Sequence, residues 1–224
     1  MIPLDMTTLD RDGALAEAEA GLSRGRFLGL GALAGAGLLL GRAGSARAAG
    51  IGAGDRAVLN YALSLEYLQA AFYTEAERAN ALKGRAAEAA QVVGAVERAH
   101  VKAFRALLGA KAIKKPRFDF QGVTEDQKKF LKTAVAFEDL AVEAYKGQAV
   151  KIRSDAVLAS ALGIHTVEAR HAAWMRYLNG IQPAVRAFDS PRPRSEIDVV
   201  VRKTGFVVAA PRMTARKRRP KYTG

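Results

Sequence analysis

The chain contains the same helical pattern twice, and this duplication restricts its fold more than any other feature. Each copy begins with a lone glutamate, Glu66 or Glu138, and reaches a Glu-x-x-His pair 31 residues later in the first copy and 30 in the second. The two pairs are Glu97 with His100 and Glu168 with His171. Aligning the lone glutamates also places Tyr73 on Tyr145. A duplicated helical hairpin is the simplest explanation.

Composition favours one all-α domain. The chain has 224 residues, half of them hydrophobic, which is enough to bury a single ordinary core. It is rich in helix-forming alanine, leucine, glutamate, lysine and arginine. It has no cysteine, which excludes disulfides and thiolate metal sites. Any bound metal must therefore be held by oxygen and imidazole ligands.

Periodicity and helix-boundary signals predict four helices, over residues 55–82, 85–108, 124–148 and 154–178. Thr124, with Gln127 three residues later, predicts a capping box at the start of the third helix. Ser154 predicts the N-cap of the fourth helix, and Gly180 its end.

The connections predict the topology. Two short links make each copy an antiparallel hairpin. The stretch between the second and third helices, residues 109–123, could span about 45 Å if extended, whereas a 24-residue helix is about 36 Å long. It can therefore cross the bundle from end to end, which makes the second and third helices parallel. The expected fold is a four-helix bundle with a long crossover between helices 2 and 3.

Each of the four glutamates interrupts an apolar stripe on its helix, as Glu66 does between Leu59, Leu63 and Ala70. All four carboxylates should therefore point into the bundle. An ionised carboxylate in a core is strongly unfavourable without a compensating charge. Two divalent metal ions would balance the four negative charges, and His100 and His171 would each add an imidazole ligand.

Four segments of the chain resemble ferritin-like proteins, in the exported bacterial branch that is grouped with plant desiccation-related proteins. They read LNYALSLEYLQAAFY, VERAHVKAFRALLG, AFEDLAVEAYKG and VEARHAAWMRYLNG, and AFDSPRPRSEI follows. The resemblance covers about residues 55–197 and implies a di-iron carboxylate bundle. It implies terminal ligands at Glu66 and Glu138, bridging ligands at Glu97 and Glu168, and one imidazole per metal from His100 and His171. Gln69 faces the site but is neutral, and we do not count it as a ligand.

Three further residues are candidates for supporting roles. Tyr73 and Tyr145 follow their glutamates by two helical turns, so they could donate hydrogen bonds to ligand carboxylates, act as redox-active phenols or be ordinary core residues. His165 lies one turn before Glu168, but Gly94 takes its place in the first copy. A symmetric ligand role is therefore excluded for His165, which leaves a satisfied polar residue or a partner of a ligand.

The ligand types leave the chemistry open. Iron in such a site reacts with dioxygen or peroxide, which gives oxidation of Fe(II) or consumption of peroxide, and manganese would suit catalase-like disproportionation. We expect a di-iron oxidoreductase that protects against oxidative or drying stress. The alternatives are a non-catalytic stress or envelope protein with a structural or vestigial metal site, and a surface-binding module. The oligomeric state stays open.

The two ends of the chain bear on location. Residues 1–49 have a long leading segment, Arg24 and Arg26, an apolar run over 27–40 and the small-x-small site Ala46-Arg47-Ala48. They predict a cleaved export signal, twin-arginine-like but interrupted by Gly25, with the route open. An uncleaved anchor or a disordered leader are the alternatives.

The bundle is expected over residues 50–180 and a C-terminal extension over 181–224. From residue 202 onward the chain carries eight basic and no acidic residues. This basic tail is either a solvated tail or a contact to an anionic envelope surface. Nucleic acid is not an expected partner of an exported chain.

Overall fold

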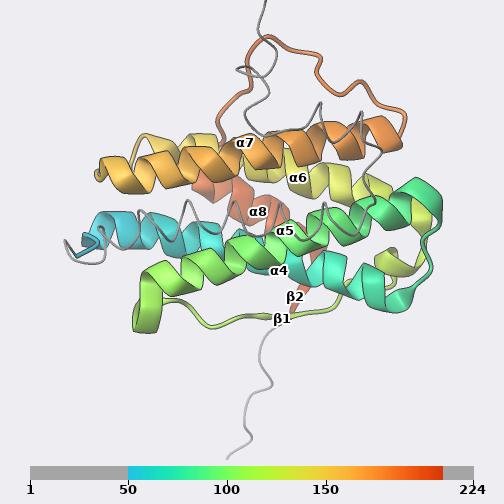
Figure 1. Cartoon of the computed structure of the whole chain (residues 1–224), viewed down its shortest axis with the longest axis horizontal. Coiled ribbons are helices and arrows are strands. Elements are labelled where there is room, and N and C mark those ends of the chain that lie inside the picture. The colour runs from blue at the N-terminus through green and yellow to red at the C-terminus, as the bar shows by residue number, and fades with distance from the viewer. Residues whose placement is uncertain (1–49, 209–224) are drawn as a thin grey trace, which may run out of the picture.

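Four long helices form the body of the molecule. The computed structural model describes residues 50–208, and Figure 1 shows the helices lying side by side along the long axis. They are α4 (Ala53–Ala79), α5 (Gly84–Leu108), α6 (Gln127–Ala149) and α7 (Asp155–Leu178). Each lies within a few residues of its predicted range. None of the helices in this described part is long and apolar enough to cross a membrane.

The long connection between α5 and α6 crosses the bundle from one end to the other. It contains the short 3-10 helices η1 (Gly109–Lys111) and η2 (Val123–Glu125), with the short strand β1 (Arg117–Phe118) between them. Figure 1 shows that α5 and α6 consequently run in the same direction, whereas α4 and α7 run the opposite way. The predicted all-α bundle with a crossover between its second and third helices is confirmed.

The predicted cap of the third helix is wrong. Helix α6 begins at Gln127, and its N-cap is Asp126, whose carboxylate accepts a hydrogen bond from the Lys129 amide at 2.8 Å. Thr124 lies in η2, where its buried hydroxyl donates to Glu75 at 2.9 Å. The side chain of Gln127 accepts a hydrogen bond from the Lys83 amide. Both residues of the expected capping box therefore bond to residues outside α6.

The predicted cap of the fourth helix is confirmed. The Ser154 hydroxyl accepts a hydrogen bond from the Val157 amide at 3.4 Å. The buried carboxylate of Asp55, at the start of α4, accepts from the amides of Arg153 and Ser154 at 2.8 and 2.9 Å. The start of α7 is thereby joined to the start of α4.

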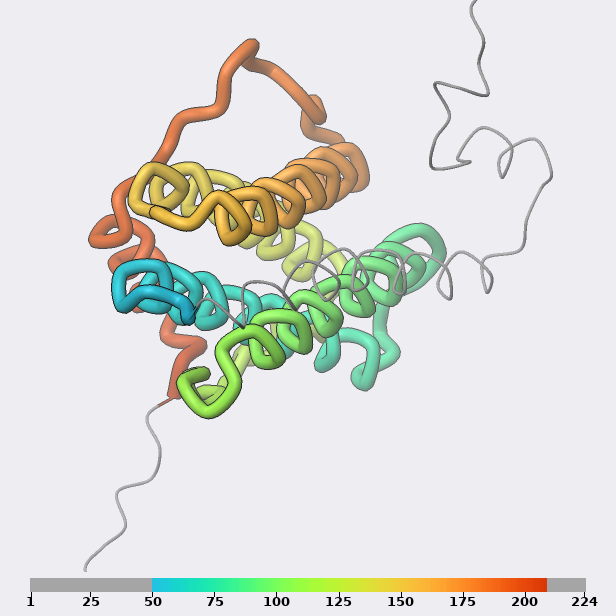
Figure 2. The backbone as a smooth tube through the Cα atoms, turned by 60° about the vertical axis from the view of Figure 1, so that its left-hand side comes forward, coloured from blue at the N-terminus to red at the C-terminus, as the bar shows by residue number. Residues whose placement is uncertain are grey.

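The C-terminal segment packs against the bundle. Helix α8 (Arg194–Thr204) lies beside α4 and α6 (Figure 2), and its fully buried Ile197 packs with Tyr61 and Leu140. The strand β2 (Val207–Val208) then pairs antiparallel with β1 of the crossover. Phe206 contacts the rings of Phe120 and Phe137. The end of the described chain therefore holds the crossover against the helices.

One glycine on α6 permits this return. The chain passes so close to Gly147 that a Cβ there would lie 2.1 Å from the carbonyl oxygen of Arg192. The Arg192 amide donates to the carbonyl of Glu143 at 3.1 Å, and its guanidinium lies 2.7 Å from the Glu143 carboxylate. A side chain at position 147 would have to displace these contacts.

We therefore expect Gly147→Ala to destabilise the fold, although alanine favours a helix. Overpacking of this kind costs about 1–3 kcal/mol, which lowers the melting temperature by roughly 2–4 °C per kcal/mol for a chain of this size. Gly163→Ala on α7 is the matched control, because nothing lies within 4 Å of its added Cβ. Thermal unfolding followed by circular dichroism compares the two. Equal melting temperatures would contradict the close packing at Gly147.

Candidate metal centre

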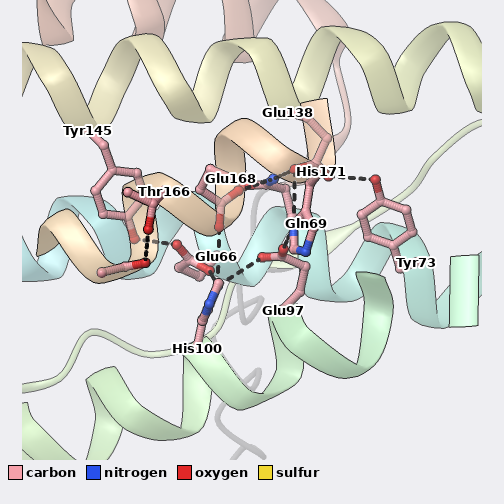
Figure 3. A network of polar contacts seen from close by, with 11 residues as sticks. Glu66, Gln69, Tyr73, Glu97, His100, Glu138, Tyr145, Thr166, Glu168 and His171 are labelled. Carbon is pink, nitrogen blue, oxygen red and sulfur yellow. Dashed lines mark hydrogen bonds and ion pairs between the residues drawn. The ribbon is translucent and has the colours of Figure 1, made fainter. Parts of the chain in front are cut away.

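Six buried ionisable side chains meet in the middle of the bundle, and every one of the four long helices contributes to them (Figure 3). Each glutamate has no exposed surface, and the two histidines are 6–7% exposed. The six are Glu66 from α4, Glu97 and His100 from α5, Glu138 from α6, and Glu168 and His171 from α7. The structure thus brings together all six residues that the sequence singled out.

The local sequence explains why these side chains point inward. On α5, buried Val93 and Phe104 lie four residues before Glu97 and four residues after His100, so all four share one face of the helix. The Glu-x-x-His spacing places the acid and the imidazole one turn apart on that face. The apolar neighbours hold this face in the core, and the polar pair is buried with it.

The two histidines face different oxygens of the Glu97 carboxylate. His100 Nδ1 lies 3.7 Å from Glu97 Oε2, and His171 Nδ1 lies 3.0 Å from Glu97 Oε1. His100 Nδ1 also lies 3.2 Å from one oxygen each of Glu66 and Glu168, whereas His171 Nδ1 lies 3.6 Å from Glu138 Oε2. The Glu97 carboxylate therefore lies between two separate polar positions.

The potential ligand atoms fall into two overlapping groups. In each group, one atom from every residue lies within 4.8 Å of the others. The His100 group consists of Glu66, Glu97, His100 and Glu168, and the His171 group of Glu97, Glu138, Glu168 and His171. Both groups contain Glu97 and Glu168. Two such carboxylates shared by two positions are what a pair of bridged metal ions requires.

Two tyrosines donate hydrogen bonds to the carboxylates from opposite hairpins. The Tyr73 hydroxyl on α4 donates to Glu138 Oε1 on α6 at 2.5 Å. In the reciprocal contact, the Tyr145 hydroxyl on α6 donates to Glu66 Oε1 on α4. Burial, reinforced by these carboxylates, raises the pKa of both phenols well above the usual range. Both tyrosines are therefore neutral donors that orient the carboxylates.

Gln69 donates to two carboxylates of the cluster, a role that the sequence alone does not predict. It is buried one turn after Glu66, and its Nε2 donates to Glu138 Oε2 at 3.1 Å and to Glu168 Oε2 at 3.3 Å. Its position on the site-facing side of α4 was visible in the sequence. Its two carboxylate partners lie on the other hairpin, and only the folded chain identifies them.

Burial and charge act against each other within the cluster. Burial raises the pKa of Glu66 to about 7 and holds the pKa of Glu168 well above its usual range. Burial acts on Glu97 too, but the facing imidazoles outweigh it and hold its pKa well below the usual range. Burial disfavours charged His171, yet Glu138 and Glu97 raise its pKa to about 10. The cluster thus balances its charge with protons, which a bound metal would displace.

Among the described residues, several buried atoms of the cluster have a close ionisable neighbour but no hydrogen bond. They are both carboxylate oxygens of Glu97, Oε1 of Glu168 and Nδ1 of His171. Buried polar atoms rarely lack a hydrogen bond, because each such atom costs free energy. Three of these four atoms belong to the two shared carboxylates. Oxygen and imidazole donors suit iron and manganese, so this donor set fits a metal pair.

His165 lies apart from the cluster. It is half-buried on α7, and the contacts described for this part of the chain do not join it to the six residues. Burial lowers its pKa, with Lys146 adding to the effect and Asp189 opposing it. These neighbours place the imidazole toward α6 and the segment before α8.

Comparison with known proteins agrees with the fold and the cluster. The sequence profile of the ferritin-like domain matches residues 54–180, which is more than half of the chain and includes all six residues of the cluster. No curated protein matches the sequence. The buried glutamates and histidines are compatible with a metal site of the kind found in ferritin-like proteins. The chain belongs to the ferritin-like domain family, with the all-α four-helix bundle and long crossover of that fold.

Proposed function

We propose that this protein binds two metal ions in the bundle and acts as a di-iron oxidoreductase. One observation carries the proposal: Glu97 and Glu168 belong to both groups of potential ligands, so the two positions share a pair of carboxylates. In the proposed assignment, Glu66 and His100 complete one position and Glu138 and His171 complete the other. Iron held by such ligands supplies oxidation chemistry with dioxygen or peroxide.

The residues around the cluster would support this chemistry in two ways. Neutral Tyr145 and Tyr73 hold protons directly against Glu66 and Glu138, where they orient the carboxylates that would hold the metal ions. Packed aromatic rings, including Phe72 stacked on Phe130 at 5.1 Å, lie beside Tyr73 and exclude water from that side. A dry site strengthens electrostatic interactions among its ligands.

We further propose that the protein works in the cell envelope as a stress-protection protein. This part rests on the sequence of residues 1–49 and of the basic tail. The leader, and the tail beyond Val208, lie outside the described residues. The tail would contact anionic envelope polymers or lipids.

Metal analysis and turnover test the enzymatic proposal together. Metal-free protein should take up about two Fe(II) ions per chain without oxygen, and should then consume dioxygen or peroxide as the iron is oxidised. Protein loaded with redox-inactive Zn(II) is the control and should consume neither. Elemental analysis and an oxygen electrode make the two measurements.

The other outcomes separate the competing functions. Peroxide consumption by the Mn(II)-loaded protein alone would replace the proposal with a catalase-like activity. Metal uptake without turnover in any form would show a structural site and contradict the enzyme. If neither Fe(II) nor Mn(II) binds, the whole proposal fails.

A further inference from the structure

The duplication makes the two proposed metal positions nearly equivalent, and Gln69 is a residue that distinguishes them. Each position has one terminal glutamate, one histidine, two shared glutamates and one tyrosine that donates from the opposite hairpin. In the alignment that superposes Glu66 on Glu138, the counterpart of Gln69 is Ala141. Alanine has no side-chain donor, so the second copy provides no equivalent of the glutamine amide.

The contacts of Gln69 lie on the side of His171. Its Nε2 holds Glu168 Oε2, whereas His100 faces the other oxygen of that carboxylate at 3.2 Å. Its second partner, Glu138 Oε2, is the oxygen that faces His171 at 3.6 Å. The amide nitrogen of Gln69 is the donor to both carboxylate oxygens.

The two terminal carboxylates consequently differ in their surroundings. Glu138 accepts from Tyr73 at one oxygen and from Gln69 at the other, so hydrogen bonds from α4 fix both of its oxygens. Glu66 accepts from Tyr145 at Oε1, and its Oε2 lies 3.2 Å from the His100 imidazole, itself a candidate ligand. Before any metal binds, Glu138 is therefore held in place more completely than Glu66.

We propose that Gln69 is a positioning residue that makes the two metal positions unequal by strengthening the one at His171. The inference rests on the proposed two-metal function. Hydrogen bonds that orient ligands before binding reduce the reorganisation that binding requires, and their loss typically lowers metal affinity about 10–100-fold. At the His100 position Gln69 contacts only the shared Glu168, and it does so through the oxygen that does not face His100, so the affinity of that position should depend less on residue 69.

Stepwise metal titration tests the inference. Metal-free wild-type protein, titrated with Co(II) in a calorimeter, should bind two ions with separate dissociation constants. Gln69→Leu keeps the approximate volume and removes the amide; it should weaken one binding step about 10-fold or more and leave the other within about twofold. Gln69→Met is a second variant of similar length in case leucine disturbs folding. Gln148→Leu is the matched control, since Gln148 is also a buried glutamine of the bundle but its Nε2 has no hydrogen-bond partner within residues 50–208.

Single-site backgrounds assign the affected step. In His100→Ala protein the remaining ion should be bound at His171, and Gln69→Leu should weaken it. In His171→Ala protein the remaining ion should be bound at His100, and Gln69→Leu should change little. Equal weakening of both steps, or no change in either, would overturn the role of Gln69 while two bound ions still supported the proposed function. Absence of Co(II) binding in the wild type would instead reject that function itself.

Discussion

Replacing Glu97 with alanine should remove both bound metals, whereas replacing Glu66 should remove only one. Glu97 belongs to both groups of potential ligands, and its two oxygens face His100 and His171 separately. Glu66 belongs only to the His100 group. Both side chains are fully buried glutamates on neighbouring helices, so they differ mainly in whether they are shared. Metal content should fall from about two ions per chain to almost none in Glu97→Ala, and to about one in Glu66→Ala.

The other hairpin repeats this experiment independently. Glu168→Ala should behave like Glu97→Ala, and Glu138→Ala like Glu66→Ala, because the same sharing relates them. Elemental analysis after loading and desalting measures the metal content, and far-ultraviolet circular dichroism verifies that each variant keeps its helices. Equal losses from shared and unshared glutamates would contradict the bridged arrangement. Activity measurements alone would miss the distinction, because loss of either ion is expected to stop turnover.

The centre of this molecule follows from the sequence because its signals are local and repeated. The Glu-x-x-His spacing places a carboxylate and an imidazole on one helical face whatever the helix later packs against, as with Glu97 and His100. The apolar stripes around these residues specify that this face is buried. The length of segment 109–123 then selects the crossover topology. Each inference uses neighbours in the chain, and the structure agrees with each of them.

The features that the sequence does not reveal depend on contacts between distant segments. Helix α8 follows a segment rich in proline and arginine, and Ile197 is its only fully buried residue. A pattern of one buried residue is too weak to mark a helix of the core. Thr124 satisfied the local rule for a helix cap, but its hydroxyl found Glu75 on α4. Gln69 likewise acquires its role only when α6 and α7 bring two carboxylates to it.

Removing the metals should lower the stability of the fold by a large amount. Each ion that binds only the folded chain contributes about 2.7 kcal/mol at a free concentration 100 times its dissociation constant. Two ions would contribute about 5 kcal/mol, which corresponds to roughly 10–20 °C in melting temperature for a chain of this size. Calorimetric scans of the loaded and the chelator-treated protein measure the difference. Reloading with Zn(II) should restore most of it, because the stabilisation needs charge and coordination and does not need redox chemistry.

The difference in melting temperature should also grow with pH. The pKa of Glu66 is raised to about 7 and that of His171 to about 10, so the folded chain holds these protons more tightly than the unfolded chain does. The metal-free fold should therefore lose stability as the pH rises from about 5 toward 10. The depressed pKa of Glu97 has the opposite sign, and its contribution is lost only as the pH falls below its ordinary value of 4.5. Metal affinity should increase over the same rise in pH, because the ligands release their protons more easily. A difference no larger at about pH 8 than at about pH 6 would show that the ions do not replace these protons, and Glu97→Ala protein should show no metal-dependent difference at either pH.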